Sequence, residues 1–203
     1  MKLIGLTGGI GMGKSACAQL LRQRAIPVVD TDDLARSLTA PGQPALVEIA
    51  HAFGSNLLDA DGCLRRDKLA DLVFHDAAKL KQLEAILHPR ITAAWREQVT
   101  QWRQEGKPSA VVVIPLLYET GAESSFDQIV CVACSAPTQR RRLLSRGWSD
   151  VEVNRRLAAQ AQVEEKISRA HRVIWSEGEL PVLAAQLDQV DRKSTRLNSS
   201  HRT

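Results

Sequence analysis

The residues near the N-terminus have the types and spacing needed to bind a phosphate group. Gly8 and Gly13 are separated by four residues and followed by Lys14 and Ser15, which satisfies the pattern GxxxxGK[ST]. Glycines let backbone N–H groups point at phosphate oxygens, and the helix that follows places its positive end against the same anion. Lys14 is expected to reach the β- and γ-phosphates of a nucleotide, and the Ser15 hydroxyl to bind Mg²⁺. The alternative is a glycine-rich turn without a ligand, but the apolar run before the loop and the apolar helical pattern after it favour nucleotide binding.

A second group that could do chemistry is the acidic cluster at 30–33, which follows the apolar stretch at 26–29. In a parallel sheet the carboxyl ends of the strands meet at the edge where ligands bind. Asp32 is therefore expected close to the γ-phosphate, where a carboxylate can accept a proton from an attacking hydroxyl or orient the metal. Asp30 or Asp32 could also cap the helix that begins near Leu34, and capping is compatible with catalysis.

Other nucleotide-binding classes lack their signatures in this chain. The guanine-reading string NKxD of regulatory GTPases does not occur. Motor and transport ATPases usually place an aspartate at the end of an apolar strand, and the best candidate strand, at 110–114, has none after it. The carboxylates that a kinase needs follow the stretch at 26–29 instead.

Basic residues cluster in a predicted helix that Pro137 opens, where Arg142 and Arg146 are spaced i and i+4 on one face. A solvated basic surface is the ordinary explanation. In a kinase, however, an arginine-bearing pair of helices closes over the phosphates and stabilises the transferring charge. Trp148 and a helix predicted at 150–161 would complete such a lid.

These groups must be positioned by an α/β fold with an inserted helical segment. Strands are predicted at 2–7, 26–29, 110–114, 128–134 and 172–174, and helices of the insertion at 44–53, 65–74, 77–87 and 89–105. We expect a break at His88, because the residue before a proline rarely stays helical. Such an insertion usually binds a second substrate. From the residues alone, His88 could be structural or functional, and Arg66 could equally be a solvated surface charge or a phosphate contact.

The predicted fold is a three-layer P-loop architecture around a parallel sheet. Its core is expected at 1–34, 106–137 and 168–190, the helical substrate domain at 35–105, and the lid at 138–167. The CxxC string at 131–134 is interpreted as two small core residues, because residues three apart in a strand face opposite sides and no second pair accompanies them.

Composition excludes several classes of protein. The 203 residues are 44% hydrophobic and 25% charged, which rules out global disorder and a disulfide scaffold. No apolar run is long enough to span a membrane. The four scattered cysteines indicate a reducing compartment, so we expect a cytoplasmic protein.

The C-terminal residues 191–203 differ from the rest of the chain. They carry four basic side chains and one acidic one, so +3 of the net charge of +4 lies there and the remainder carries +1. A nucleic-acid partner is therefore not expected. The string DRKSTRLNSSH at 191–201 resembles the translation of a sequencing-library adapter, and we interpret 191–203 as a non-native tail rather than a basic disordered one.

From Lys2 to about Leu187 the chain resembles the dephospho-CoA kinases. The strings that carry the resemblance are LTGGIGMGKS, VVDTDDLAR, DGCLRRDKL, LHPRI, IPLLYE, RRRLLSR and RRLAAQ. Many families share a phosphate loop, but its combination with DxDxxAR, HPxI and PLLxE is specific to this one. The resemblance implies ATP-dependent phosphorylation of the ribose 3′-hydroxyl of dephospho-CoA, the last step of CoA biosynthesis, with Mg²⁺ as cofactor.

The resemblance also implies roles for individual residues. ATP would be bound by the loop and the lid, through Gly9, Gly11, Met12, Gly13, Lys14, Ser15, Ala16, Arg142 and Arg146. Asp32 would be the catalytic base, with Lys14 and Arg142 as further catalytic groups and Ser15 as the Mg²⁺ ligand. Dephospho-CoA would contact Asp32, Arg66 and His88.

Two positions depart from the family pattern. Ala16 stands where threonine usually follows the loop serine, and Ser176 stands where the family usually has an asparagine near adenine. Neither change removes a group needed for phosphoryl transfer. The expected protein is a monomer or weak oligomer without a membrane partner. The rival hypotheses are another small-molecule kinase, for a nucleoside or sugar acid, and a catalytically impaired nucleotide-binding protein.

Overall fold

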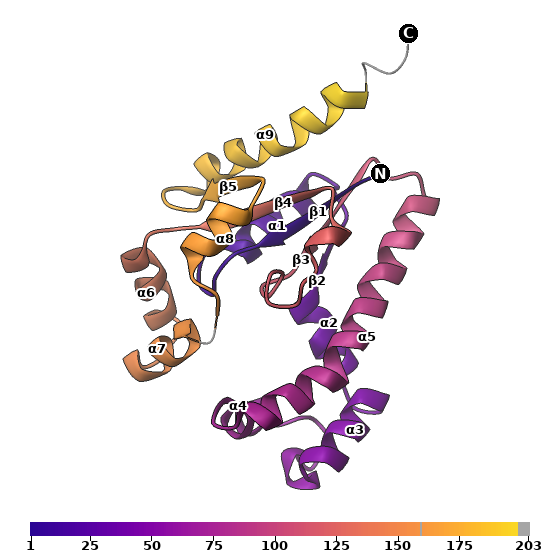
Figure 1. Ribbon diagram of the computed structural model, residues 1–203, viewed down its shortest axis with the longest axis vertical. Coiled ribbons are helices and arrows are strands. Elements are labelled where there is room, and N and C mark those ends of the chain that lie inside the picture. Colours follow the sequence, from indigo (N-terminus) through magenta and orange to yellow (C-terminus); the bar gives the residue numbers. More distant parts are fainter. Residues whose placement is uncertain (159, 199–203) are drawn as a thin grey trace. The chain divides into compact units, whose positions relative to one another are not determined.

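The computed structural model describes residues 1–158 and 160–198 (Figure 1). The chain divides into two compact units, one formed by Met1–Val28 with Trp102–Thr203 and the other by Val29–Gln101. Within the described residues, no helix is long and apolar enough to cross a membrane.

A five-stranded sheet lies mostly in the first unit. Its strands are β1 (Lys2–Thr7), β2 (Val28–Asp30), β3 (Ser109–Val113), β4 (Gln128–Ala133) and β5 (Arg172–Trp175), in the order β2-β3-β1-β4-β5. β1 pairs in parallel with both β3 and β4, and β4 pairs in parallel with β5. The α/β fold class with a parallel sheet is confirmed. Because β1 is the central strand, the phosphate loop that follows it begins in the middle of the carboxyl edge.

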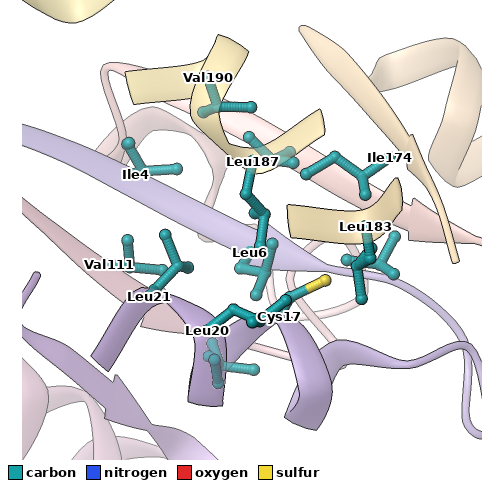
Figure 2. Close-up of a cluster of buried hydrophobic side chains, with 14 residues drawn as sticks. Ile4, Leu6, Cys17, Leu20, Leu21, Val111, Ile174, Leu183, Leu187 and Val190 are labelled. Carbon is teal, nitrogen blue, oxygen red and sulfur yellow. The ribbon is translucent and has the colours of Figure 1, made fainter. Parts of the chain in front are cut away.

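One face of the sheet is covered by helices. The helices of the first unit are α1 (Lys14–Gln23), α6 (Ala136–Leu144), α7 (Asp150–Ala158), α8 (Val163–Arg169) and α9 (Leu180–Asn198). Apolar side chains of α1 and α9 pack against alternate residues of the strands in one buried cluster. Figure 2 shows Leu6 of β1 gathered with Cys17 of α1 and Leu187 of α9. Burying this apolar surface fixes the start of α1, and hence of the loop before it, against the sheet.

The opposite face carries the segment after β3 and helix α8. A Cβ added to Gly5 would lie 2.8 Å from Leu117 Cδ1 and 3.0 Å from Phe126 Cδ2, so this segment, which includes the turn η2 (Glu123–Ser125), sits directly on β1. Val163 and Ile167 of α8 pack against a buried cluster that contains Met12 of the phosphate loop with Ala133 and Cys134. Both faces of the sheet therefore contribute to holding the loop.

The edge strand β5 is closed by a side chain of α9. The Trp175 N–H donates to Gln186 Oε1 (2.9 Å), and Gln186 Nε2 donates to the Trp175 carbonyl (2.8 Å). Since β5 ends the strand order, these two bonds satisfy backbone groups that point away from β4.

The second unit is helical. It contains α2 (Thr31–Leu38), α3 (Pro44–Phe53), the turn η1 (Ser55–Leu57), α4 (Arg66–Phe74) and most of α5 (Ala77–Gln104). Apolar residues of α3, η1, α4 and α5 form its core. The sequence predicted α3 with its observed bounds.

The predicted break at His88 is wrong, because α5 continues through Pro89. Proline removes the N–H that would bond the carbonyl four residues earlier. One residue further on, Arg90 Nη1 donates to the Ile86 carbonyl (2.6 Å), and Arg90 Nη2 also bonds Glu48 of α3 (2.5 Å). Ile86 before the proline is buried, as is Trp95 after it, so packing on both sides holds the helix together.

The region at 138–167 contains more helices than expected. The helix predicted at 150–161 ends at Ala158, and a separate helix, α8, follows it. Arg140 of α6 forms an ion pair with Asp150 and donates to Asn154 Oδ1 of α7 (2.8 Å), which joins these two helices. A lid at 138–167 that moves as one body stays a prediction. The predicted tail begins inside α9, and 199–203 lie outside the described residues.

The cysteine environments predict selective thiol labelling. Burial raises the pKa of Cys17 to about 12 and that of Cys131 to about 11, and also raises the pKa of Cys134, whereas Cys63 is exposed. A small alkylating reagent at neutral pH should therefore modify one thiol per native molecule within minutes and all four after denaturation. Cys63→Ser should abolish the fast reaction in mass spectra. A second fast-reacting thiol in the native protein would contradict the packing described here.

Candidate active site

The backbone of the phosphate loop has the conformation that its glycines permit. Gly8, Gly11 and Gly13 have φ angles of 142°, 76° and 92°. A Cβ at Gly8 would lie 2.2 Å from the Val132 carbonyl oxygen of β4, so no larger residue fits there. Gly13 is the N-cap of α1, and within the described residues no side chain caps this helix and its first turn holds no acidic residue. The positive end of α1 is therefore directed at the loop without a competing carboxylate.

Lys14 lies over the loop that precedes it. Its Nζ donates to the carbonyls of Gly8 (2.8 Å) and Gly9 (3.0 Å), so the positive charge is held at the loop. Ser15, in the first turn of α1, is exposed. Its hydroxyl is a hard oxygen donor beside a phosphate-binding loop, which fits Mg²⁺, an ion that proteins hold through few ligands plus substrate phosphates.

Two glutamines hold the tip of the loop. Gln139 Nε2 of α6 donates to the Ile10 carbonyl (2.7 Å), and Gln160 Oε1 accepts from the Ile10 N–H (3.0 Å). Ile10 therefore has both backbone groups bonded to side chains from the 138–167 region. Sequence reasoning did not single out either glutamine as a loop contact, although Gln160 closes the string RRLAAQ.

Arg142 is the basic residue of α6 that reaches the loop. Its Nη1 donates to the carbonyl of Gly11 (3.4 Å) and to Ser176 Oγ (2.8 Å), and its Nη2 donates to the Ser176 carbonyl (2.6 Å). The predicted placement of Arg142 and Arg146 on one helical face is wrong, because α6 ends at Leu144 and Arg146 lies exposed beyond it. Gly147, at φ 84°, turns the chain there.

In the acidic cluster at 30–33, the structure assigns the helix-capping role to Asp30. Asp30 is the N-cap of α2, and its side chain accepts from the Asp32 N–H (2.9 Å). Asp32 and Asp33 lie in the first turn of the same helix with exposed side chains. Asp30 therefore caps α2, and the Asp32 carboxylate faces solvent.

Arg66 and His88 both lie in the second unit. Arg66 Nη2 donates to Thr39 Oγ1 (2.7 Å) and to the Arg36 carbonyl (3.2 Å). Partial burial, and then the nearby charge of Arg36, lower the pKa of Arg66. Arg66 lines a cavity of about 190 Å³ whose other walls are mostly apolar. The remaining lining residues are Ala35, Thr39, Leu64, Leu69, Ala70, Val73, Leu83 and Leu87. His88, half-buried in α5, directly follows one of them.

Beyond the carboxyl end of β3, a buried lysine forms an ion pair with a partly exposed glutamate. Lys166 of α8 is 0% exposed, and its Nζ contacts Glu119 Oε1 (2.8 Å) and donates to the Pro115 carbonyl (2.8 Å). Glu119 also accepts from the Ala161 N–H (3.1 Å). Burial alone would raise the pKa of Glu119, but the hydrogen bonds from Lys166 and Ala161 outweigh it and hold the pKa below its usual value. The pair ties the string IPLLYE to α8 and to the chain that leads into it.

The structure places the predicted residues in both units. The first unit brings Lys14 and Arg142 onto one loop, and it also holds Arg146. The second unit holds Asp32, Arg66 and His88.

Comparisons with known proteins agree in one description. A family model described as dephospho-CoA kinase matches residues 2–181. The chain is 46% identical over 191 residues to a dephospho-CoA kinase of Anaeromyxobacter dehalogenans (strain 2CP-C), covering 94% of this chain and 90% of that protein.

Solved structures share the fold along nearly the whole chain. The crystal structure of TT1252 from Thermus thermophilus matches with a TM-score of 0.81 at 36% identity, covering 95% of this chain and 97% of that one. A dephospho-CoA kinase from Campylobacter jejuni matches with a TM-score of 0.71 at 24% identity, covering 98% and 100%. At that identity the second likeness speaks for the fold alone.

Proposed function

This chain belongs to the dephospho-CoA kinase family, and from that premise we propose that it transfers the γ-phosphoryl group of ATP to the ribose 3′-hydroxyl of dephospho-CoA. The products are CoA and ADP, which makes the protein a transferase of CoA biosynthesis. The observation that carries the proposal is the phosphate loop, whose glycine conformations, α1 N-terminus and Lys14 amino group converge on one anion site.

On the nucleotide side, the chain supplies positive charge and fixed geometry. Loop N–H groups and the end of α1 bind the phosphates, and Lys14 and Arg142 stabilise negative charge as the γ-phosphoryl group moves. Gly9, Gly11, Met12, Gly13 and Ala16 complete the ATP site through the backbone, with Arg146 approaching from the 138–167 region. Ser15 would hold Mg²⁺, which when bound neutralises charge on the β- and γ-phosphate oxygens.

On the acceptor side, we propose that Asp32 is the general base. Its carboxylate accepts the proton of the 3′-hydroxyl as that oxygen bonds to the γ-phosphorus, and the bond from phosphorus to the β,γ-bridging oxygen breaks with its electron pair leaving on ADP. Asp30 caps α2, so the Asp32 side chain is not needed as a cap, and it is exposed. Both observations support this role. We assign Arg66 and His88 to binding dephospho-CoA, and the cavity beside Arg66 supports this with apolar walls and one cation.

The remaining assignments concern the protein in the cell. We propose that it works in the cytoplasm as a monomer or weak oligomer, and its four free cysteines suit a reducing compartment. The region at 138–167 acts as a lid that closes on ATP, supported by its two glutamine contacts with the loop.

ADP release tests the proposed function directly. The purified chain with MgATP should form ADP when dephospho-CoA is present and should not respond to adenosine, shikimate or gluconate. The product should be identified as CoA by mass spectrometry and phosphorus NMR. If folded protein that binds ATP showed no turnover dependent on dephospho-CoA, the assignment would be wrong. Equal turnover with another acceptor would move it to a different small-molecule kinase.

A further inference from the structure

We propose that Ser176 is a positioning residue for ATP binding, one whose hydroxyl fixes both the Arg142 guanidinium and the backbone of the phosphate loop. The proposal deepens the proposed function and rests on it for the assignment of ATP as the nucleotide. Ser176 touches the loop from the carboxyl end of β5, an element remote in sequence from the other loop residues.

The Ser176 hydroxyl both donates and accepts a hydrogen bond. It donates to the Met12 carbonyl (2.7 Å) and accepts from Arg142 Nη1 (2.8 Å), so its single proton is committed to the loop. Ser176 is 6% exposed, which leaves little room for water to replace either bond. One buried hydroxyl thus links the loop backbone to the cation beside it.

The backbone of Ser176 is anchored independently of the hydroxyl. Its N–H donates to the Ala133 carbonyl of β4 (2.8 Å), and its carbonyl accepts from Arg142 Nη2 (2.6 Å). The guanidinium is therefore held by two atoms of one residue that the sheet keeps in place. Removing the hydroxyl leaves the guanidinium its bond to the Ser176 carbonyl and the longer bond to the Gly11 carbonyl (3.4 Å), and so loosens it.

Ser176 also packs against the last glycine of the loop. A Cβ added to Gly13 would lie 3.0 Å from Ser176 Cβ and 3.6 Å from Arg142 Nη1. Gly13 directly precedes Lys14 and caps α1, so Ser176 borders the point where the loop becomes the helix. Its contacts bear on the geometry that receives the phosphates.

Loss of the hydroxyl should weaken ATP binding and, through Arg142, should also slow the chemical step. The Met12 carbonyl and Arg142 Nη1 would each lose a partner in a partly buried place, and the loop would have to be ordered again when ATP binds. The effect on the loop is shared by the ground state and the transition state and raises KM, whereas a loosened Arg142, which stabilises the transferring charge, also lowers kcat.

Serine 145 supplies a matched control. Its Oγ donates to the Arg142 backbone carbonyl (2.9 Å), and it is exposed. Ser145→Ala therefore removes the same group from a contact with the same residue, but it leaves the guanidinium untouched.

The experiment compares Ser176→Ala, Ser176→Cys and Ser145→Ala in the full chain. Both Ser176 variants should raise KM for ATP about tenfold, the size of one charged hydrogen bond, and lower kcat, with the KM for dephospho-CoA within about twofold of the parent. Calorimetric titration with ATP alone should show the same rise in Kd. Ser145→Ala should change neither the KM nor the Kd for ATP. Ser176→Cys keeps the side-chain volume, so it separates loss of the hydrogen bonds from loss of packing.

A double-mutant cycle tests the route through Arg142. In an Arg142→Ala background, Ser176→Ala should change the Kd for ATP by less than about threefold. Unchanged ATP affinity in both Ser176 variants, or an undiminished effect in the Arg142→Ala background, would overturn the proposal. Calorimetry needs no acceptor, so it decides the role of Ser176 even if the parent protein fails to phosphorylate dephospho-CoA.

Discussion

Asp32→Asn should lower kcat for dephospho-CoA phosphorylation by about 10²–10⁴-fold, the range for loss of a positioned general base. Asparagine has nearly the same shape but cannot accept the proton of the 3′-hydroxyl. Asp30 would still cap α2 through the residue 32 N–H, so the local fold should persist. Steady-state ADP release, with ATP binding measured by calorimetry, checks the result.

Asp33→Asn is the matched control for this prediction. Asp33 lies beside Asp32 in the same first turn and is also exposed, but it pairs with Arg36 at 3.8 Å. Its variant should retain activity within about threefold, because surface ion pairs contribute little. Activity of Asp32→Asn within tenfold of the parent would remove Asp32 from the role of base. Equal losses in both variants would point to an electrostatic effect of the cluster instead.

Lys166→Met should destabilise the fold by about 1–3 kcal/mol, because it removes the buried partner of the Pro115 carbonyl and of the Glu119 carboxylate, whose side chain is 25% exposed. Lys166 is 0% exposed, and its amino group also satisfies the Pro115 carbonyl, so no surface rearrangement can replace it. Urea unfolding followed by circular dichroism measures the change. Lys79→Met, which removes an exposed pair with Asp76 (3.6 Å), should leave the midpoint nearly unchanged.

The partner variant Glu119→Gln checks the same pair through pH. The folded state holds the Glu119 pKa below its usual value, so the ionised carboxylate stabilises the fold above that value and this stabilisation is lost as pH falls through the folded pKa. The stability gap between parent and Glu119→Gln should therefore be full at pH 7 and shrink below about pH 4.5. A gap that stayed constant into acid would show that the charge is not what stabilises the pair.

The parts of the fold that the sequence predicted well have local signals. The strand before the phosphate loop is a continuous apolar run, and the loop is marked by glycines whose φ angles only glycine adopts easily. The continuity of α5 could not be predicted from Pro89, because the proline signal is local, whereas the burial of Ile86 and Trp95 and the bond from Arg90 to Glu48 depend on the folded unit.

The contacts that hold the site were out of reach for a different reason. Arg142 and Ser176 meet across 34 residues of sequence, and Glu119 meets Ala161 across 42. A serine after a strand or a lysine in a helix belongs to no sequence pattern that indicates a partner so distant in the chain. Spacing predicts candidate chemistry-bearing residues, and their roles stay predictions, whereas the contacts that hold them follow only from the folded arrangement.

The glutamine that bonds the backbone of Trp175 has a consequence for how this chain behaves in a crowded solution. An open sheet edge is a template on which another chain can add a strand, and such additions lead to aggregates. Gln186 offers the edge the donor and the acceptor that an incoming strand would offer, from within the same molecule. A strand of another chain would have to displace this amide before it could pair with β5 at Trp175. The Gln186 side chain therefore disfavours aggregation through this edge.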